Sequence, residues 1–251
     1  MSQVPEIVLP VKWEKERNFG YNLDMKEMIF QDRRDAGRRL AEVLKQWSFP
    51  NADILVLGIP RGGLVVADEV AKALSAPLDV VICRKIRAPY QPELGIGAVV
   101  DGHHITILNE DLVRAVGATK EYLAKEIAYQ KEEIDRRLKY YRGDRPSPDI
   151  SGKTVIVIDD GIATGYTFRA ALEGLRQYQP AWLVAAAPVA AQDSAEMLKA
   201  FTDVVICIST PAFFMAVGSW YRDFEQVSDE EAAGILQRSW TRQSFVYEAS
   251  A

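Results

Sequence analysis

Short aliphatic runs alternate with longer amphipathic stretches over most of the chain. Apolar residues at helical spacing, with arginines between them, predict a helix over residues 31–47. Further helices are expected from about residue 63 to Leu74 and over residues 166–177. Uninterrupted aliphatic segments, typical of strands buried on both faces, lie at residues 53–59, 77–84, 154–158, 182–189 and 204–208. This βαβ alternation predicts an α/β fold with a central, mainly parallel sheet flanked by helices.

One long polar stretch interrupts the alternation. Residues 119–141 carry leucine and isoleucine at helical intervals, with Glu132 and Glu133 four residues before Arg136 and Arg137. Opposite charges at this spacing stabilise an exposed helix. We therefore expect an extra long, solvated amphipathic helix here, and a helix that binds a partner stays open as the alternative.

The segment before this helix reads as irregular. Residues 85–97 combine prolines, glycines and charges, and they predict a loop. Residues 98–108 resemble a hairpin with Gly102 at its turn, and His103 and His104 follow that turn. Because no cysteine or carboxylate stands near the two histidines at ligand spacing, they do not indicate a zinc site.

The C-terminal segment opens with an aromatic-rich stretch. Residues 211–224 show neither strand nor helix periodicity. Ser228 and Glu231 then fit the N-cap and N3 positions of a capping box, which predicts a helix to about Gln237.

Composition narrows the class of protein. The chain has 251 residues, of which 48% are hydrophobic and 26% charged, as in ordinary globular proteins. A net charge of −5 argues against nucleic-acid binding and against an anionic membrane surface. An anionic substrate would therefore need a local basic patch.

The sequence also indicates a compartment. Cys83 and Cys207 fall inside predicted strands and do not suggest a disulfide framework. The first residues lack the basic and apolar regions of a signal peptide, and no apolar run approaches the length of a membrane span. We expect a reducing, cytoplasmic environment.

Residues 155–167 carry the clearest chemical signal. A β-branched strand ends in Asp159 and Asp160, followed by a small-residue loop with Thr164 and Thr167 and then a helix. In parallel sheets, ligands bind beyond the carboxyl ends of the strands. Loop hydroxyls and a helix N-terminus suit a phosphate, and paired carboxylates suit ribose hydroxyls or hydrated Mg²⁺.

This segment resembles the signature of type I phosphoribosyltransferases, which bind 5-phosphoribosyl-1-pyrophosphate (PRPP). The resemblance implies that Asp159 and Asp160 bind the ribose hydroxyls, and Mg²⁺ through water. It assigns the 5′-phosphate to the loop of Gly161, Ala163, Thr164, Gly165 and Thr167. Gly161 departs from the pattern, because the family more often has an aliphatic residue there.

Two further segments fit the same resemblance. The Gly-rich loop of residues 58–63 would bind pyrophosphate through Arg61, Gly62 and Gly63, and its Pro60–Arg61 bond corresponds to a frequent cis peptide of the family. The basic pair Arg84 and Lys85 at the next strand end would bind the same group. The expected catalytic residues are Asp159, Asp160 and Lys85. Residues 86–98 would form a mobile lid that excludes water.

The C-terminal aromatics are candidates for the second substrate. Family members place a hood over the strand ends, and it selects the nucleophile. By that resemblance Trp220, Tyr221 and Asp223 would contact the acceptor, with Phe213 and Phe214 as further aromatic candidates. Aromatic clusters also pack cores and dimer interfaces, and that reading stays open.

The resemblance implies one domain over residues 1–251, with a core at about 31–210 and a small hood or cap from residues 1–30 and 211–251. The whole arrangement is similar to a broad bacterial group named only as predicted phosphoribosyltransferases. A homodimer is expected, with no nucleic-acid or membrane partner.

The implied reaction transfers the phosphoribosyl group to a nitrogen nucleophile, a nucleobase or a related compound, with Mg²⁺-assisted release of pyrophosphate. Two alternatives stay open. One is a PRPP-binding regulatory protein with little or no transferase activity. The other is an unrelated α/β hydrolase or receiver domain, which the absence of a Gly-x-Ser-x-Gly elbow and the mid-chain position of the acidic pair disfavour.

Overall fold

A computed structural model of the protein describes residues 29–101 and 105–249. Its central sheet has five parallel strands in the order β2-β1-β6-β7-β8. The α/β fold with a parallel sheet flanked by helices is as the sequence predicts. The strands are β1 (Ile54–Gly58), β2 (Leu78–Val80), β6 (Thr154–Ile158), β7 (Trp182–Val189) and β8 (Val204–Ser209).

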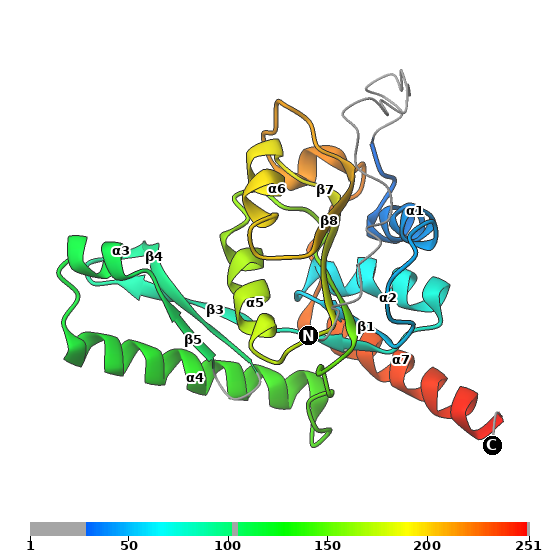
Figure 1. The fold of residues 1–251 in the computed structure, drawn as a ribbon, viewed down its shortest axis with the longest axis horizontal. Helices are drawn as coiled ribbons and strands as arrows, with labels where there is room; N and C mark the ends of the chain where they lie inside the picture. The colour runs from blue at the N-terminus through cyan, green and yellow to red at the C-terminus, as the bar shows by residue number, and fades with distance from the viewer. Residues whose placement is uncertain (1–28, 102–104, 250–251) are drawn as a thin grey trace, which may run out of the picture.

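Side chains of the central strands alternate between two layers of helices. In β1, Val56 packs into the core on one face, whereas Leu55 and Leu57 pack into the core on the other. The first core includes α1 (Arg33–Lys45), α2 (Gly62–Leu74) and α7 (Asp229–Ala249), and the second includes α5 (Tyr166–Arg176) and α6 (Gln192–Leu198). The helices therefore lie on both sides of the sheet, as Figure 1 shows. The short helix α6 is not among the elements that the sequence predicted.

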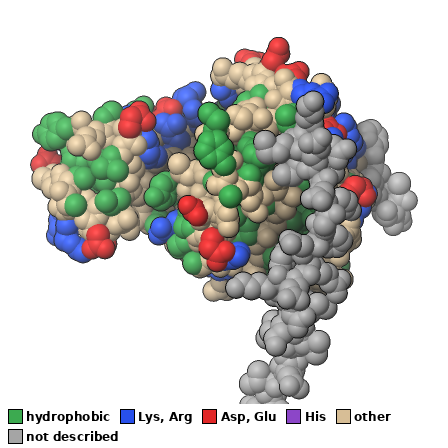
Figure 2. All heavy atoms as spheres, turned by 90° about the horizontal axis from the view of Figure 1, so that it is seen from above, with side chains coloured by type: hydrophobic (Ala, Val, Ile, Leu, Met, Phe, Trp, Pro, Cys, Tyr) green, Lys and Arg blue, Asp and Glu red, His purple; other side chains and the backbone are tan. Residues whose placement is uncertain are grey.

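The segment after β2 forms an arm that projects from this core. It consists of an antiparallel sheet with two helices beside it (Figure 1), and it stands out as a lobe in Figure 2. We call this whole segment the arm. Its elements are β3 (Cys83–Ala88), β4 (Gln91–Val100), β5 (Ile105–Leu108), α3 (Glu110–Ala115) and α4 (Lys120–Arg142).

The predicted loop over residues 85–97 is wrong, because these residues form most of the β3–β4 hairpin. The lid role expected of residues 86–98 stays a prediction. The glycines that suggested a loop instead allow close packing between strands. A Cβ atom on Gly97 would lie 2.4 Å from the carbonyl oxygen of Ile107. The predicted strand over residues 77–84 is likewise divided between β2 and β3. The predicted hairpin turn at Gly102, with His103 and His104, lies outside the described residues.

The predicted long helix is confirmed as α4, and the Thr119 hydroxyl caps it by accepting from the backbone N–H of Tyr122 at 3.1 Å. Its ion pairs differ from the expected set. Arg136 pairs with Glu133 at 3.1 Å, three residues away rather than four. One face of α4 is not solvated, because Ile134 is buried in the same hydrophobic cluster as Ile86 and Ile96 of the antiparallel sheet. The helix therefore supports the antiparallel sheet.

The C-terminal segment returns across the sheet. A one-turn 3₁₀ helix (Val217–Trp220) precedes Tyr221, which pairs with Phe30 in an isolated parallel bridge. The capping box is confirmed, since the Ser228 hydroxyl accepts from the N–H of Glu231 at 3.0 Å. The helix α7 that follows is longer than predicted, because Trp240 still reaches the core and donates to the carbonyl of Leu78.

Within the described part of the chain, no helix combines the length and apolarity needed to cross a lipid bilayer.

Candidate active site

The Gly-rich loop and the acidic pair lie side by side because β1 and β6 are neighbours in the sheet. Gly58, the last residue of β1, pairs with Ile158, the last residue of β6. A Cβ atom on Gly63 would lie 2.7 Å from the carbonyl oxygen of Ile158 and 2.9 Å from Asp159 Oδ1. The two segments, about a hundred residues apart in sequence, thus form one surface at the carboxyl ends of the strands, where α/β sheets bind ligands.

The conformation of the Gly-rich loop agrees with the resemblance. The peptide bond between Pro60 and Arg61 is cis, as the resemblance implied. Gly62 and Gly63 then begin α2, so that their backbone meets the acidic pair at the N-terminus of that helix. A helix N-terminus favours an anion.

Asp160 is held by Arg33, a residue that sequence reasoning missed. Arg33 Nε lies 2.7 Å from Asp160 Oδ2, and the two side chains are only 11% and 15% exposed. The guanidinium also donates to the carbonyl of Glu225 and stacks over the ring of Phe224, 3.8 Å from its centroid. Nothing in the sequence separated Arg33 from the other arginines of α1, because its partner lies 127 residues away.

The two carboxyl groups of the acidic pair both have raised pKa values. Asp159 Oδ1 accepts from the backbone N–H of Asp160 at 2.8 Å. Burial, and then the charge of Asp160, raise the pKa of Asp159 well above its usual range. Burial also raises the pKa of Asp160, although the ion pair with Arg33 opposes that rise. Neighbouring carboxyls in a poorly hydrated site resist double ionisation, so the pair is suited to binding hydroxyl groups or a cation.

The loop of residues 161–165 is held by the segment that follows β7 and by helix α6. Ile162 bridges Ala190, and the Ser194 hydroxyl donates to the carbonyl of Ala163. Gly165, with φ of 73°, turns the chain into α5. Thr164 and Thr167 are exposed around the start of that helix. Their hydroxyls and the helix N-terminus are therefore accessible to an anion, as the motif implies.

Val217 explains why a glycine stands at position 161. A Cβ atom on Gly161 would lie 2.4 Å from Val217 Cγ1. The valine comes from the 3₁₀ helix of the C-terminal segment and occupies the space that a side chain at position 161 would take. The C-terminal segment thus reaches the acidic motif directly.

The basic pair does not sit where the sequence placed it. Arg84 and Lys85 belong to β3 of the arm, not to the end of a parallel strand. Successive residues of a strand face opposite ways. Accordingly, Arg84 Nε donates to Gln130 Oε1 on α4 at 3.0 Å, whereas Lys85 Nζ donates to the carbonyl of Glu93 at 2.9 Å. The two cations therefore do not act as one unit in this structure.

The acceptor candidates occupy different environments. Tyr221 is 6% exposed, and its hydroxyl donates to the carbonyl of Asp160. It therefore holds the motif in place and offers its ring to Phe30, 5.3 Å away between centroids, rather than to a ligand. Trp220 is half-buried and stacked on Phe214, and Asp223 is exposed, with its carboxylate accepting from the N–H of Glu225. Phe213 is 80% exposed.

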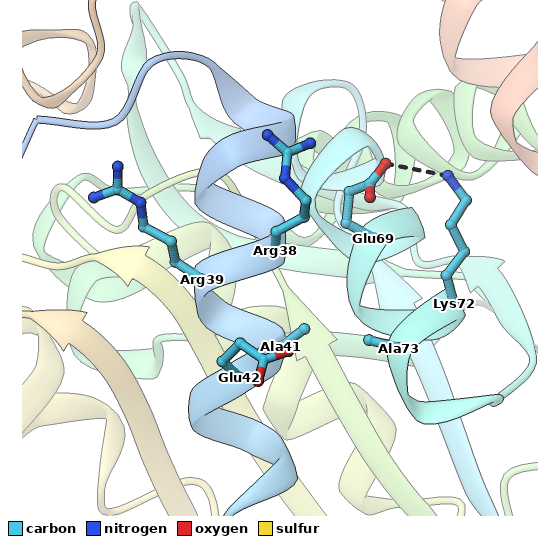
Figure 3. Close-up of a pocket in the computed structure, with 7 residues that line it drawn as sticks. All are labelled: Arg38, Arg39, Ala41, Glu42, Glu69, Lys72 and Ala73. Carbon is cyan, nitrogen blue, oxygen red and sulfur yellow. Dashed lines mark hydrogen bonds and ion pairs between the residues drawn. The ribbon is translucent and has the colours of Figure 1, made fainter.

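A separate pocket lies between α1 and α2 (Figure 3). It is lined by Arg38, Arg39, Ala41, Glu42, Glu69, Lys72 and Ala73. Lys72 pairs with Glu69 at 3.1 Å, and Arg39 with Asp35 at 2.9 Å. None of the residues that line the pocket belongs to the acidic motif or to the Gly-rich loop, so the pocket is separate from the site at the strand ends.

The donor set fits a weakly held Mg²⁺ rather than a metal caged by protein. Among the described residues, no three His, Cys, Asp or Glu side chains are grouped to hold a metal ion. Mg²⁺ usually binds through one or two carboxylates together with waters and substrate phosphates. Asp159 and Asp160 satisfy that requirement.

Comparisons with known proteins agree with this geometry. The relatives include "Putative phosphoribosyl transferase MT0597" and "Putative phosphoribosyl transferase Rv0571c", from Mycobacterium tuberculosis strains CDC 1551 / Oshkosh and ATCC 25618 / H37Rv. Each is 42% identical over 214 residues, which are 84% of this chain and 47% of the relative. The chain thus spans about half the length of the curated relatives it matches.

A solved structure matches over almost its whole length. The crystal structure of TT1426 from Thermus thermophilus has a TM-score of 0.74 and 42% identity, covering 84% of this chain and 98% of that one. A family model described as phosphoribosyl transferase domain matches residues 27–222, which include both the acidic motif and the arm. The chain belongs to the phosphoribosyl transferase domain family.

Proposed function

We propose that the protein transfers the 5-phosphoribosyl group of PRPP to a nitrogen nucleophile, a nucleobase or a related compound, and releases pyrophosphate. The observation that carries this proposal is the contact between the Gly-rich loop and the acidic pair. An anion-binding loop and two carboxylates on one surface match a substrate with both phosphates and ribose hydroxyls.

In the proposed complex, Asp159 and Asp160 accept hydrogen bonds from the ribose hydroxyls. The ion pair with Arg33 fixes the orientation of the Asp160 carboxylate, so that this side chain needs to move little when the substrate binds. The exposed Thr164 and Thr167 hydroxyls and the N-terminus of α5 bind the 5′-phosphate. Gly62, Gly63 and Arg61 bind the pyrophosphate on the β1 side.

The chain's own contribution to the reaction is positional and electrostatic. The bond from C1 of the ribose to pyrophosphate breaks while the bond to the nucleophile forms, and positive charge develops on the ring. The two carboxylates below the ring lower the cost of that charge. A carboxyl with a raised pKa also accepts the proton of the nucleophile more readily near neutral pH.

Mg²⁺ is part of the proposal. Asp159 and Asp160 would hold it, through water, and its chemistry is to neutralise charge on the leaving pyrophosphate. The nucleophile would approach from the C-terminal segment, where Trp220, Phe213 and Asp223 offer apolar and polar contacts.

The test is pyrophosphate release from PRPP and Mg²⁺ across a panel of purine and pyrimidine bases, with PRPP binding measured by calorimetry. Asp159→Asn and Asp160→Asn should abolish release. The control is Asp53→Asn, because Asp53 lies just before β1, at the opposite end of the strand from the Gly-rich loop, and pairs with Lys153. That variant should behave as the wild type.

The outcomes separate the alternatives. Release that depends on one base supports the transferase and identifies its acceptor. PRPP binding that depends on the two aspartates, without release for any base, replaces the transferase with a PRPP-sensing protein. Absence of PRPP binding overturns the assignment of the acidic motif.

A further inference from the structure

The inference concerns the face of α4 that packs against β3. Polar side chains on this face each meet a partner on the opposite strand. Glu126 pairs with Arg87 at 2.7 Å, and Gln130 accepts from Arg84 at 3.0 Å. At these two positions a side chain of α4 therefore satisfies the hydrogen-bonding needs of an arginine of β3.

Arg137 breaks this pattern. It stands seven residues after Gln130 and so lies on the same face of the helix. Its Nε atom is buried and has no hydrogen-bond partner within the described residues, and no described carboxylate forms an ion pair with its guanidinium. Its neighbour Arg136, by contrast, is exposed and paired with Glu133. A buried guanidinium nitrogen without a partner is costly unless something else binds it.

Arg137 lies near the end of α4 that packs against α7 of the core, and not at the outer end of the arm. Tyr141, one turn further along α4, is buried and donates to Asp229 Oδ1 at 2.6 Å. Burial and Asp229 raise the pKa of this tyrosine, and the charges of Arg137 and Arg61 both oppose that rise. Arg61 belongs to the Gly-rich loop. Arg33 lies against Gly62 of that loop and also donates to the carbonyl of Glu225, four residues before Asp229. The loop and this end of the arm therefore lie near each other, and their arginines lie around a common region.

Arg84 completes the group. The pKa of Glu133 is lowered first by its hydrogen bond from Arg136 and, with that residue, by the charges of Arg84 and Arg137. Arg61, Arg84 and Arg137 have no ion pair with a described carboxylate. Three arginines without acidic partners around one region indicate a site for a multiply charged anion.

We propose that Arg137 of α4 binds the pyrophosphate group of PRPP together with Arg61 and Arg84, so that the arm supplies part of the substrate site. The inference rests on the proposed function. Pyrophosphate fits better than the 5′-phosphate, because Arg61 follows β1 whereas the 5′-phosphate loop follows β6 and contacts Ala190 after β7.

The test compares Arg137→Ala with Arg136→Ala, a change of the same charge on the next residue. Calorimetry with Mg²⁺ measures the affinity for pyrophosphate and, separately, for ribose 5-phosphate. Arg137→Ala should weaken pyrophosphate binding by about tenfold or more while ribose 5-phosphate binding stays within about twofold. Arg136→Ala should leave both affinities within about twofold of the wild type.

Each outcome decides the inference. If wild-type protein binds neither PRPP nor pyrophosphate, both this inference and the proposed function fail. If wild-type protein binds both and Arg137→Ala binds pyrophosphate equally well, or Arg136→Ala loses as much affinity, only the role of Arg137 fails. Should Arg137→Ala not fold, Arg137→Lys is used instead, because lysine keeps the positive charge but cannot form the two parallel hydrogen bonds of a guanidinium. A pyrophosphate affinity between those expected for the wild type and for alanine supports the role of Arg137. An unchanged affinity overturns it.

Discussion

Gly62 and Asp160 approach so closely that no side chain fits between them: a Cβ atom on Gly62 would lie 1.9 Å from Asp160 Oδ2 and 2.7 Å from Arg33 Nε. The glycine is therefore required by the ion pair beneath it. The pair in turn occupies the space between α1, α2 and the end of β6. The Gly-rich loop, the acidic motif and the start of α1 are therefore packed directly against one another, and a substitution in one of them should displace the other two.

Gly62→Ala should displace the Asp160 carboxylate and abolish PRPP binding, with a loss of about 1–3 kcal/mol in the free energy of unfolding from overpacking. Denaturant unfolding and calorimetry measure the two effects. Gly234→Ala is the matched control. Its Cβ would meet only the end of the Arg238 side chain in α7, so it should stabilise the helix by up to about 1 kcal/mol. Normal PRPP binding by Gly62→Ala would contradict the close packing.

Removing Arg33 should be far more damaging than removing its neighbour. Arg33→Ala leaves the buried Asp160 unpaired, which costs roughly 3–5 kcal/mol of stability. It should also raise the pKa of Asp160 further, because Arg33 is the group that lowers it. Arg34→Ala breaks only an ion pair of a 39% exposed arginine with Glu69, worth about 0–1 kcal/mol. Urea denaturation of the two variants tests the contrast, and equal losses would refute it.

Gly161 and Val217 should be energetically coupled. Gly161→Ala forces a Cβ against Val217 and should cost about 1–3 kcal/mol in unfolding free energy. In a Val217→Ala background the same substitution should cost markedly less, because the obstructing methyl groups are gone. A double-mutant cycle measures this difference directly, and additive losses would show that the two residues do not compete for space.

Stability should depend on pH through Asp101, at the junction of the arm and the core. Burial, partly offset by the ion pair with Arg142 at 3.2 Å, raises its pKa from 3.8 to about 6. A raised pKa in the folded state means that the folded protein binds this proton more tightly than the unfolded chain. This carboxyl therefore favours folding most below pH 4 and loses that contribution, roughly 3 kcal/mol, as pH rises to about 6.

Asp101→Asn tests this prediction through the slope of unfolding free energy against pH. The absolute stability is not informative, because the substitution also removes an ion pair. Unfolding free energies measured between pH 4 and pH 6.5 should fall less steeply with pH for the variant. Asp79 also has a raised pKa, chiefly from burial, and shares Arg142 at 2.7 Å, so some slope should remain. Parallel curves would contradict the prediction.

The parts of the fold that could be predicted are those where local pattern and tertiary role coincide. β6 is buried along its whole length, so its aliphatic run indicated both a central strand and the position of the acidic pair. The cap of α4 by Thr119 and that of α7 by Ser228 depend only on residues within one turn. Aliphatic runs and helix caps can therefore be recognised from neighbouring residues alone.

The arm and Arg33 could not be read in the same way. Gly95 and Gly97 suggest a loop by composition, but they serve close contact with Lys85 and Ile107, which no local pattern reveals. Arg33 has its function only through a partner on another layer, and Val217 only through the space at Gly161. The sequence thus indicated the local motifs of the candidate site, but not the contacts between residues of different motifs.

The arm also bears on how the chain folds. The register of β1 and β6 joins Ile54 to Thr154, so the central sheet closes only after a long intervening segment has been bridged. The entropy of closing a loop grows logarithmically, by about 0.6 kcal/mol for each doubling of its length. Most of the segment is the arm, whose own contacts are local. The arm is thus an insertion that the core tolerates for less than about 1 kcal/mol of closure entropy, which leaves its length and shape open to change without loss of the sheet.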